Sequence, residues 1–272
     1  MVLEIADDLD LVRIAGSGQC FRWEPAPSGG FRVLNGARCL YVRELEEESF
    51  ELSCDEAEFN DVWKGYFDLS EDYAAIRSRI DPRADPFLWR AMEEEKGIRI
   101  LRQDPWEMLV TFIISQNKNI PVIRRSVNLL CEACGEKLTD ARGEAFFAFP
   151  APEAVAALGD EQLKACSLGY RGRYVYEAAV AVASGELDLE GLRTAGEDET
   201  IAALMKLPGV GVKVANCVSL FGLHHVNAFP IDVWVKRVLE EKYQHGYPFE
   251  EYAPYNGIYQ QYMFAYYRNT RS

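Results

Sequence analysis

The sequence predicts an α+β fold, with an N-terminal antiparallel β-sheet domain (residues 1–85) followed by a helical body (residues 86–272). Three observations predict it. Asn35-Gly36 joins two short apolar runs, which is the strongest local signal of a β-hairpin. From about Phe59 onward the apolar residues recur at helical spacing. Late in the chain, a glycine-rich turn at 207–211 separates two helical patterns.

The individual elements follow from local signals. Gln19–Trp23 is expected to form a short strand, and Phe31–Leu34 pairs with Ala37–Val42 as the hairpin. Asp85-Pro86 supplies an N-cap and a first-turn proline for a helix that ends near Lys96. Asp104-Pro105-Trp106-Glu107 does the same, with a capping box, for the apolar run Met108–Ser115. Further helices are predicted at Asn119–Ala133, Pro152–Leu158, Asp160–Cys166, Arg171–Ser184, Glu199–Lys206, Val212–Phe221, Asp232–Lys242 and Tyr255–Arg268.

Composition excludes several classes of protein. The chain has 272 residues, 49% hydrophobic and 26% charged, which is an ordinary globular balance and rules out disorder and coiled coil. No apolar stretch approaches the length of about 20 residues that a membrane-spanning helix needs. The N-terminus is acidic where a signal peptide would be basic, and seven cysteines at irregular spacing fit reduced thiols. We therefore expect a cytoplasmic protein with no membrane partner.

The net charge of −14 argues, taken alone, against nucleic acid as a partner. The acidity is concentrated in the first 100 residues, which hold 12 basic and 22 acidic side chains. Runs such as Glu44–Glu48 and Glu93–Glu95 are interpreted as a solvated acidic surface. The remaining 172 residues hold 17 basic and 21 acidic side chains. Their net charge of −4 does not exclude a nucleic acid as a partner of that part of the chain.

The segment Leu207-Pro208-Gly209-Val210-Gly211, followed by Val212-Lys213-Val214-Ala215, is the most informative part of the chain. Proline ends the first helix, and the glycines permit positive φ or the close approach of a partner. The backbone N–H groups that open the next helix carry the positive end of its dipole and can hold a phosphate oxygen without a basic side chain. Gly209, Val210 and Gly211 are therefore predicted to bind DNA, with a monovalent cation as one aid. A tight turn that binds nothing is the alternative.

Lys213 and Asp232 form the candidate catalytic pair. A lone lysine on such a helix is most often a surface residue or a phosphate contact, and Asp232 in Pro230-Ile231-Asp232-Val233-Trp234 is placed to cap the next helix. Together, however, an amine and a carboxylate are the groups needed to attack the anomeric carbon of a sugar. A neutral lysine is a nucleophile, and a carboxylate stabilises the oxocarbenium-like charge as the base leaves.

With these residues in view, the sequence resembles the 8-oxoguanine DNA glycosylase/AP lyase family of the helix-hairpin-helix-GPD DNA glycosylases. The resemblance runs over nearly the whole chain in six blocks that occur in the family's order. They are Ser17–Trp23, Phe112–Ile120, Leu168–Tyr174, Leu207–Cys217, Pro230–Val233 and Gly257–Phe264.

The resemblance implies a role for each candidate residue in the excision of 8-oxoguanine. Lys213 would be the nucleophile that forms a Schiff base with the sugar, with Asp232 as its electrostatic partner. The Gly18 carbonyl would accept the N7–H that 8-oxoguanine has and guanine lacks, and Gln260 would read the Watson–Crick edge of the base. Phe264 and Cys217 would lie against its two faces, although ordinary packing in the core is an alternative for both.

The resemblance also implies contacts with the opposite strand. Asn117 would fill the gap left in the duplex, Tyr170 would wedge into the stack, and Arg171 would read the orphaned cytosine. Val122 departs from the family pattern, because a second arginine is expected there, and we therefore expect weaker dependence on the opposite cytosine. Trp234 departs as well, because a histidine often occupies its position. Whether Lys118, Arg124 and Arg125 contact DNA is left open.

The resemblance implies no metal or organic cofactor. No cysteine follows Cys217, so the iron–sulfur cluster of endonuclease III-like relatives is not expected, and Cys131-x-x-Cys134 lacks the second pair of a metal site. We expect a monomer acting on double-stranded DNA, associated with the nucleoid. A monofunctional glycosylase for alkylated bases, which needs no Lys213, and a non-enzymatic DNA-binding protein, which needs no Asp232, are the alternatives. A small-molecule enzyme with a Schiff-base lysine would leave the hairpin unexplained.

Overall fold

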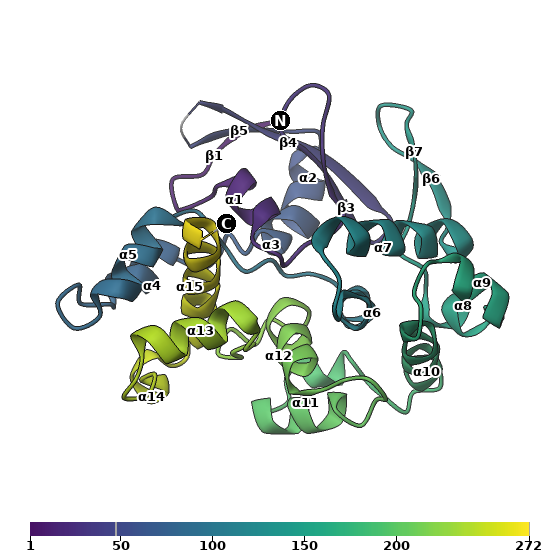
Figure 1. Cartoon of the computed structure of the whole chain (residues 1–272). Coiled ribbons are helices and arrows are strands. Elements are labelled where there is room, and N and C mark those ends of the chain that lie inside the picture. The colour runs from purple at the N-terminus through teal and green to yellow at the C-terminus, as the bar shows by residue number, and fades with distance from the viewer. Residues whose placement is uncertain (47, 272) are drawn as a thin grey trace.

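A computed structural model of the chain describes residues 1–46 and 48–271. The N-terminal part is a five-stranded antiparallel sheet in the order β1-β5-β4-β3-β2, which lies along one side of the molecule (Figure 1). Its strands are β1 (Val2–Glu4), β2 (Trp23–Pro25), β3 (Phe31–Asn35), β4 (Arg38–Glu46) and β5 (Ser49–Leu52). The predicted α+β class, with an antiparallel N-terminal sheet, is confirmed. The division at residue 85 stays a prediction.

The helices form the rest of the molecule. In the first third they are α1 (Leu11–Gly16), α2 (Glu56–Glu58), the π-helical turn η1 (Phe59–Trp63), α3 (Lys64–Tyr66), α4 (Tyr73–Ser78) and α5 (Pro86–Glu94). The central part contains α6 (Pro105–Ser115), α7 (Ile120–Cys134), the strands β6 (Lys137–Thr139) and β7 (Ala145–Phe147), α8 (Pro152–Ala156), α9 (Asp160–Ala165) and α10 (Arg171–Ala183). The last part holds η2 (Gly191–Arg193), α11 (Glu197–Leu204), α12 (Val212–Phe221), α13 (Val233–Lys242), α14 (Phe249–Tyr252) and α15 (Asn256–Arg271).

Several local predictions need correction. The strand expected at Gln19–Trp23 begins only at Trp23, because the buried side chain of Gln19 hydrogen-bonds the backbone of Arg99 and Leu101 instead. Helix α1 and strands β1 and β5 are not among the predicted elements. Asp104 caps α6 as expected, but the carboxylate of Glu107 pairs with Arg22 at 3.5 Å and does not complete a capping box.

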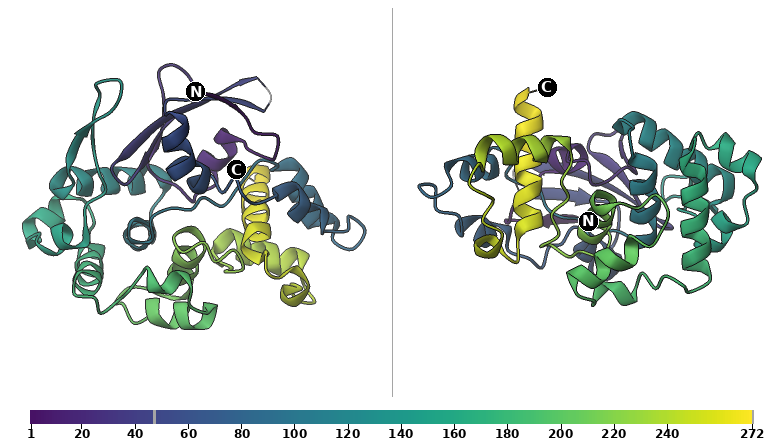
Figure 2. Two further views of the ribbon diagram at one scale, coloured as in Figure 1. Left: turned by 180° about the vertical axis from the view of Figure 1, so that it is seen from behind. Right: turned by 60° about the horizontal axis from the view of Figure 1, so that its bottom comes forward.

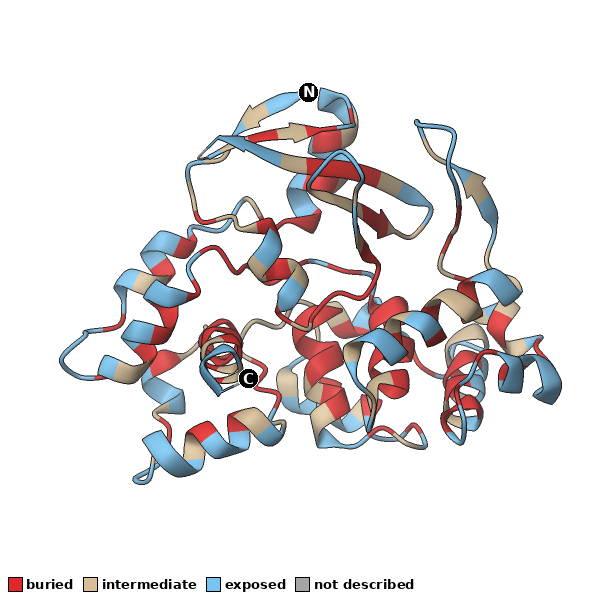
Figure 3. Cartoon of the chain, turned by 45° about the horizontal axis from the view of Figure 1, so that its top comes forward, coloured by how far each residue is buried: buried red, intermediate tan, exposed pale blue. Residues whose placement is uncertain are grey.

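Two apolar clusters organise the interior. One lies behind the sheet and includes Trp23, Leu40 and Phe67. The larger one fills the helical body around α6, of which every residue from Pro105 to Ile114 is buried. Buried residues gather in the middle of the molecule, whereas the loop between β6 and β7 and the outer helices are exposed (Figure 3). Of the predicted acidic run Glu44–Glu48, Glu47 lies outside the described residues, and Glu44 and Glu46 are exposed.

The C-terminal helix α15 brings the end of the chain back to its beginning. It packs on α5 and α13, while α12 packs on α6 (Figures 1 and 2). As a result, the start of α12, the start of α13, the face of α15 and the turn after α1 converge on one place. Within the described ranges, no helix is both long enough and apolar enough to traverse a bilayer.

Candidate active site and DNA interface

A small pocket lies where these four segments meet. It is called the Lys213 pocket below, and its volume is about 60 Å³, the space of about two water molecules in the liquid. Its walls come from the turn after α1, the helices α6, α12 and α15, and the segment before α13. The lining residues are Ser17, Gly18, Phe112, Lys213, Cys217, Phe221, Pro230, Asp232, Gln260, Gln261 and Phe264. The pocket therefore unites all six residues predicted for catalysis and base recognition.

Lys213 lies in the first turn of α12 and is half-buried. Its Nζ is 5.4 Å from the ring centroid of Phe112, so the amine lies against an aromatic face. Cys217 follows one helical turn later. Burial raises the pKa of the Cys217 thiol, while the neighbouring amine of Lys213 opposes that rise. Cys217 is therefore a neutral, buried thiol beside the amine.

Asp232 is the N-cap of α13, as predicted. One carboxylate oxygen accepts hydrogen bonds from the backbone N–H of Trp234 at 2.9 Å and of Val235 at 2.8 Å. These bonds fix the carboxylate at the wall of the pocket that Lys213 also lines. Among the ion pairs of the described residues, none joins Lys213 to Asp232. The amine and the carboxylate thus line the same pocket without forming an ion pair with each other.

Gly18 faces the aromatic ring of Phe264 across the pocket. Its φ is +79°, a left-handed conformation that glycine adopts without strain. A Cβ at this position would lie 3.6 Å from the Phe264 ring, which is ordinary contact, so the backbone conformation rather than space requires glycine. The turn presents backbone groups to the pocket.

Gln260 offers an unused acceptor. Its Nε2 donates to the carbonyl of Pro230 at 3.0 Å, and its buried Oε1 has no hydrogen-bond partner. Because an unpartnered buried polar atom is costly, such an atom at a pocket wall indicates a ligand with N–H donors. Phe264, one turn further along α15, and Cys217 on α12 contribute the apolar walls.

The hairpin before α12 is shaped by its first glycine. Gly209 has φ +79°, and a Cβ there would come within 2.3 Å of the Tyr174 ring. Gln116 donates to the Gly209 carbonyl at 3.0 Å, which fixes the turn from the end of α6. Gly211 caps α12 with an extended backbone, and Val210 packs into the core. The predicted hairpin is present, and its DNA contacts stay a prediction.

Three further candidate residues, Asn117, Tyr170 and Arg171, gather at a second place, called the Tyr170 surface. Val122, which follows Asn117 by five residues, is counted with this surface. Asn117 has φ +51°, and its amide lies 3.5 Å from the Tyr170 hydroxyl. Tyr170 is 57% exposed, whereas Arg171 is buried beneath its ring and donates to the carbonyl of Gln116. The Nε of Arg171 has no partner. Val122 is exposed on the first turn of α7.

Several residues near these places were either left open or not singled out by the sequence. Lys118 donates to the hydroxyl of Ser126 on α7 and to the carbonyl of Ser167, so it links α7 to the segment between α9 and α10. Burial lowers the pKa of Lys118. Trp234 packs on Tyr267. Phe112, Phe221 and Gln261 line the Lys213 pocket, and only their place in or beside the family blocks could have indicated this.

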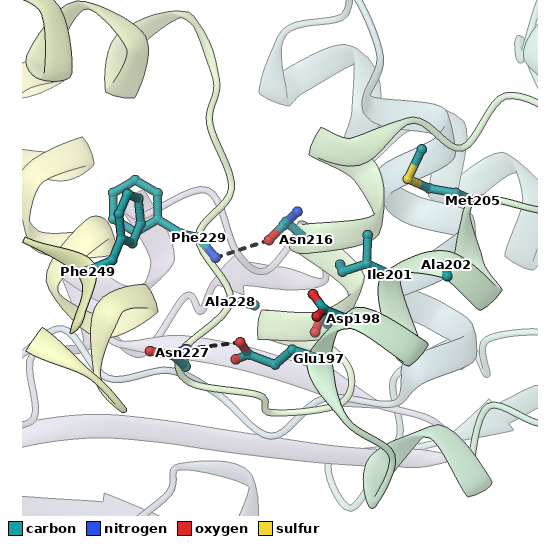
Figure 4. A pocket seen from close by; sticks show the side chains of 11 residues that line it. Glu197, Asp198, Ile201, Ala202, Met205, Asn216, Asn227, Ala228, Phe229 and Phe249 are labelled. Carbon is teal, nitrogen blue, oxygen red and sulfur yellow. Dashed lines mark hydrogen bonds between the residues drawn. The ribbon is translucent and has the colours of Figure 1, made fainter. Parts of the chain in front are cut away.

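Neither a second cavity nor the cysteines add an obvious catalytic site. A cavity of about 590 Å³ is lined by residues of α11 and α12, by the segment 227–229 and by Phe249 (Figure 4). It does not include Lys213 or Asp232. Across residues 1–46 and 48–271, no group of three or more His, Cys, Asp or Glu side chains could hold a metal ion. Cys131 and Cys134 are free thiols on α7.

Comparison with known proteins identifies the family. The family model of the 8-oxoguanine DNA glycosylase N-terminal domain matches residues 2–109, and that of the HhH-GPD superfamily base excision DNA repair proteins matches residues 110–248. The chain is 37% identical over 160 residues to an N-glycosylase/DNA lyase of Saccharomyces cerevisiae (55% of this chain, 43% of that protein). It is 30% identical over 235 residues to the N-glycosylase/DNA lyase OGG1 of Arabidopsis thaliana (82% and 63%).

Two solved structures have a similar fold over the full length of this chain. The structure of MBOgg1 in complex with a low-affinity DNA ligand matches with a TM-score of 0.92 and 34% identity, covering 100% of this chain and 96% of that one. The 8-oxoguanine glycosylase/lyase of Clostridium acetobutylicum, bound to double-stranded DNA with cytosine opposite 8-oxoG, matches with a TM-score of 0.90 and 32% identity, covering 100% and 99%. The chain spans 43% to 63% of the length of three curated N-glycosylase/DNA lyase relatives, those of Saccharomyces cerevisiae, Arabidopsis thaliana and Methanothermobacter thermautotrophicus. It belongs to the 8-oxoguanine DNA glycosylase family of the HhH-GPD superfamily.

Proposed function

We propose that this protein is a bifunctional DNA glycosylase/AP lyase that excises 8-oxoguanine from duplex DNA and then cuts the strand. One observation carries the proposal: Lys213, Asp232, the Gly18 turn and the unpartnered Oε1 of Gln260 line a single pocket. Enzymes that act on a base remove it from the stack, which costs a few kcal/mol, and read it in a pocket of this kind.

The chemistry assigns a separate role to each side chain. The amine of Lys213, in its neutral form, attacks C1′ of the sugar, the C1′–N9 bond breaks, and the base leaves with the bonding electrons and one proton from the amine. The C1′–O4′ bond then breaks, O4′ takes the second amine proton, and an imine joins Lys213 to C1′. Asp232 stabilises the positive charge that develops on the sugar. The resulting imine loses a C2′ proton, and the C3′–O3′ bond then breaks by β-elimination. No step requires a metal or an organic cofactor.

Base recognition depends on hydrogen-bond polarity. The carbonyl of Gly18 accepts the N7–H of 8-oxoguanine, whereas guanine would present a lone pair to that oxygen. Gln260 has its Nε2 engaged by Pro230, so its Oε1 accepts from the donors on the Watson–Crick edge of the base. Phe264 and Cys217 then cover the two faces of the ring. A neutral thiol fits that role because it packs as a small apolar group.

The duplex would be held by the hairpin and by the Tyr170 surface. Backbone N–H groups of Gly209, Val210 and Gly211, with a monovalent cation as one aid, grip phosphate on a chain of net charge −14. Asn117 fills the gap left by the extruded base, Tyr170 wedges beside it, and Arg171 contacts the orphaned cytosine. We infer a monomer that acts in the cytoplasm on nucleoid DNA, and the seven free cysteines support a reducing compartment.

The second candidate is a monofunctional glycosylase for alkylated bases, because the chain is also 28% identical over 169 residues to the DNA-3-methyladenine glycosylase of Bacillus subtilis. Such an enzyme activates water and leaves Lys213 without a role. The position of the amine inside the pocket favours the covalent mechanism.

Borohydride trapping on a duplex with one 8-oxoguanine opposite cytosine tests the proposal. The wild type should form a covalent adduct with DNA and Lys213→Gln should form none. Lys236→Gln, an exposed residue of α13 away from the pocket, is the matched control and should form the adduct normally. Base loss without an adduct would support the water-using glycosylase. Duplex binding with neither adduct nor base loss would support a DNA-binding protein without activity.

A further inference from the structure

One face of helix α15 packs against the turn that contains Gly18. Gln261, Phe264 and Arg268 are spaced three and four residues apart, so their side chains lie on the same face of the helix. All three contact the turn or the wall of the Lys213 pocket that the turn forms. This contact joins the last helix of the chain to a segment about 250 residues earlier.

Helix α15 binds two successive carbonyls, that of Gly16 at the end of α1 and that of Ser17 at the start of the turn. Nε2 of Gln261 donates to the carbonyl of Ser17 at 2.6 Å, and Nη2 of Arg268 donates to the carbonyl of Gly16 at 2.6 Å. The next carbonyl belongs to Gly18, and among the residues described none donates to it. The three oxygens therefore divide into two that fix the turn and one that remains for a ligand.

Arg268 also supports the aromatic wall. Its guanidinium lies 5.1 Å from the ring centroid of Phe264, within the range of a cation–π contact. Burial lowers the pKa of Arg268, and the negative charges of Glu95 and Asp232 oppose that change. The same side chain thus contacts both the residue that leads into the Gly18 turn and the Phe264 ring.

We propose that Arg268, together with Gln261, is a positioning residue for base recognition: it fixes the Gly18 carbonyl and the Phe264 ring relative to each other, and thereby sets the preference for 8-oxoguanine over guanine. This inference rests on the proposed function. Arg268 acts through Gly18 and Phe264 and takes no part in bond breaking. Because an abasic sugar has no base to be read, the lyase step on a preformed abasic site should not depend on Arg268.

The test compares two reactions of the same variants. Arg268→Gln retains a polar side chain but loses the planar cation and the reach to Gly16, and Arg268→Lys retains the charge. Arg271→Gln is the matched control, because Arg271 lies on the same helix and pairs with Glu241 outside the pocket. Single-turnover excision is measured for 8-oxoguanine and for guanine opposite cytosine. Strand cleavage is measured on a preformed abasic site, and thermal unfolding is recorded for each variant.

We expect Arg268→Gln to lower the rate of 8-oxoguanine excision about tenfold, since small displacements of groups that position a substrate have effects of this size or larger. The ratio of 8-oxoguanine to guanine excision should fall, cleavage of the abasic site should stay within about twofold, and Arg268→Lys should recover part of the excision rate. Parallel losses in both reactions would overturn the proposal and indicate a phosphate contact or a folding defect. Unchanged excision in Arg268→Gln would also overturn it. If neither the wild type nor Arg271→Gln excises 8-oxoguanine, the proposed function itself has failed.

Discussion

The Lys213 pocket and the Tyr170 surface are built in different ways. In the pocket, the groups proposed to meet a base are fixed by hydrogen bonds with the backbone: Asp232 by two N–H groups of α13, Gln260 by a carbonyl, and the Gly18 turn by α15. On the Tyr170 surface, the aromatic ring is 57% exposed, Asn117 makes a long contact, and the position of a second arginine holds Val122. The structure thus holds the proposed catalytic groups firmly, and it holds the residues proposed to contact the opposite strand more loosely.

Gln116 and Tyr174 connect the Tyr170 surface to the hairpin before α12. Gln116 accepts a hydrogen bond from Arg171 through its carbonyl and donates through its side chain to the Gly209 carbonyl. Tyr174, on the same helix as Arg171, packs against Gly209. These contacts fix the position of the hairpin, which is proposed to bind the damaged strand, relative to the segment that is proposed to contact the other strand.

The largest effect expected from a single substitution is that of Asp232→Asn. Asparagine is as good an N-cap as aspartate, so the free energy of unfolding should change by less than about 0.5 kcal/mol. Loss of the negative charge should slow base excision by about 10²–10³-fold, the usual cost of removing an electrostatic contact to the transition state. Single-turnover excision and chemical denaturation of the same preparation separate the two effects. A wild-type rate in this variant would show that Asp232 serves only as a cap.

A smaller effect, on the free energy of unfolding, is expected in the hairpin, where Gly209 and Gly211 have different surroundings. Gly209→Ala requires φ +79° and places a Cβ within 2.3 Å of the Tyr174 ring, so it should cost about 1–3 kcal/mol of stability. Gly211→Ala has extended backbone and meets nothing within 4 Å, so its cost should be below about 1 kcal/mol. Urea denaturation of both variants measures the difference. Equal costs would mean that the packing of Tyr174 on the hairpin is not what constrains Gly209.

The sequence predicted the pocket better than it predicted the sheet. Lys213 and Asp232 are placed by strong local signals, a Pro-Gly turn and an N-cap, so both helix starts were assigned correctly. The strand at Gln19 was wrong because its buried amide binds Arg99 and Leu101, 80 and 82 residues away, and no local pattern reports such a contact. The bonds from Gln261 and Arg268 to the turn after α1 were missed for the same reason.

The smallest expected effect is a change at the Tyr170 surface in the preference for cytosine over adenine opposite the lesion. With Val122 in place of an arginine, the wild type should discriminate only weakly between cytosine and adenine opposite the lesion. Val122→Arg, at an exposed position on the first turn of α7, should raise the preference for cytosine about tenfold, at the lower end of the 1–3 kcal/mol that a bidentate contact to a base contributes.

The control is Val122→Lys, which adds the same charge without the planar pair of donors. A gain from charge alone would tighten binding to both duplexes and appear equally in both variants. A gain from base reading should appear in Val122→Arg and only opposite cytosine. Excision rates on the two duplexes at one salt concentration measure this, since phosphate contacts depend strongly on salt. If Val122→Arg leaves the ratio unchanged, the Tyr170 surface cannot be adjusted at this position. The weak discrimination must then come from Arg171, which donates to Gln116 beneath the Tyr170 ring.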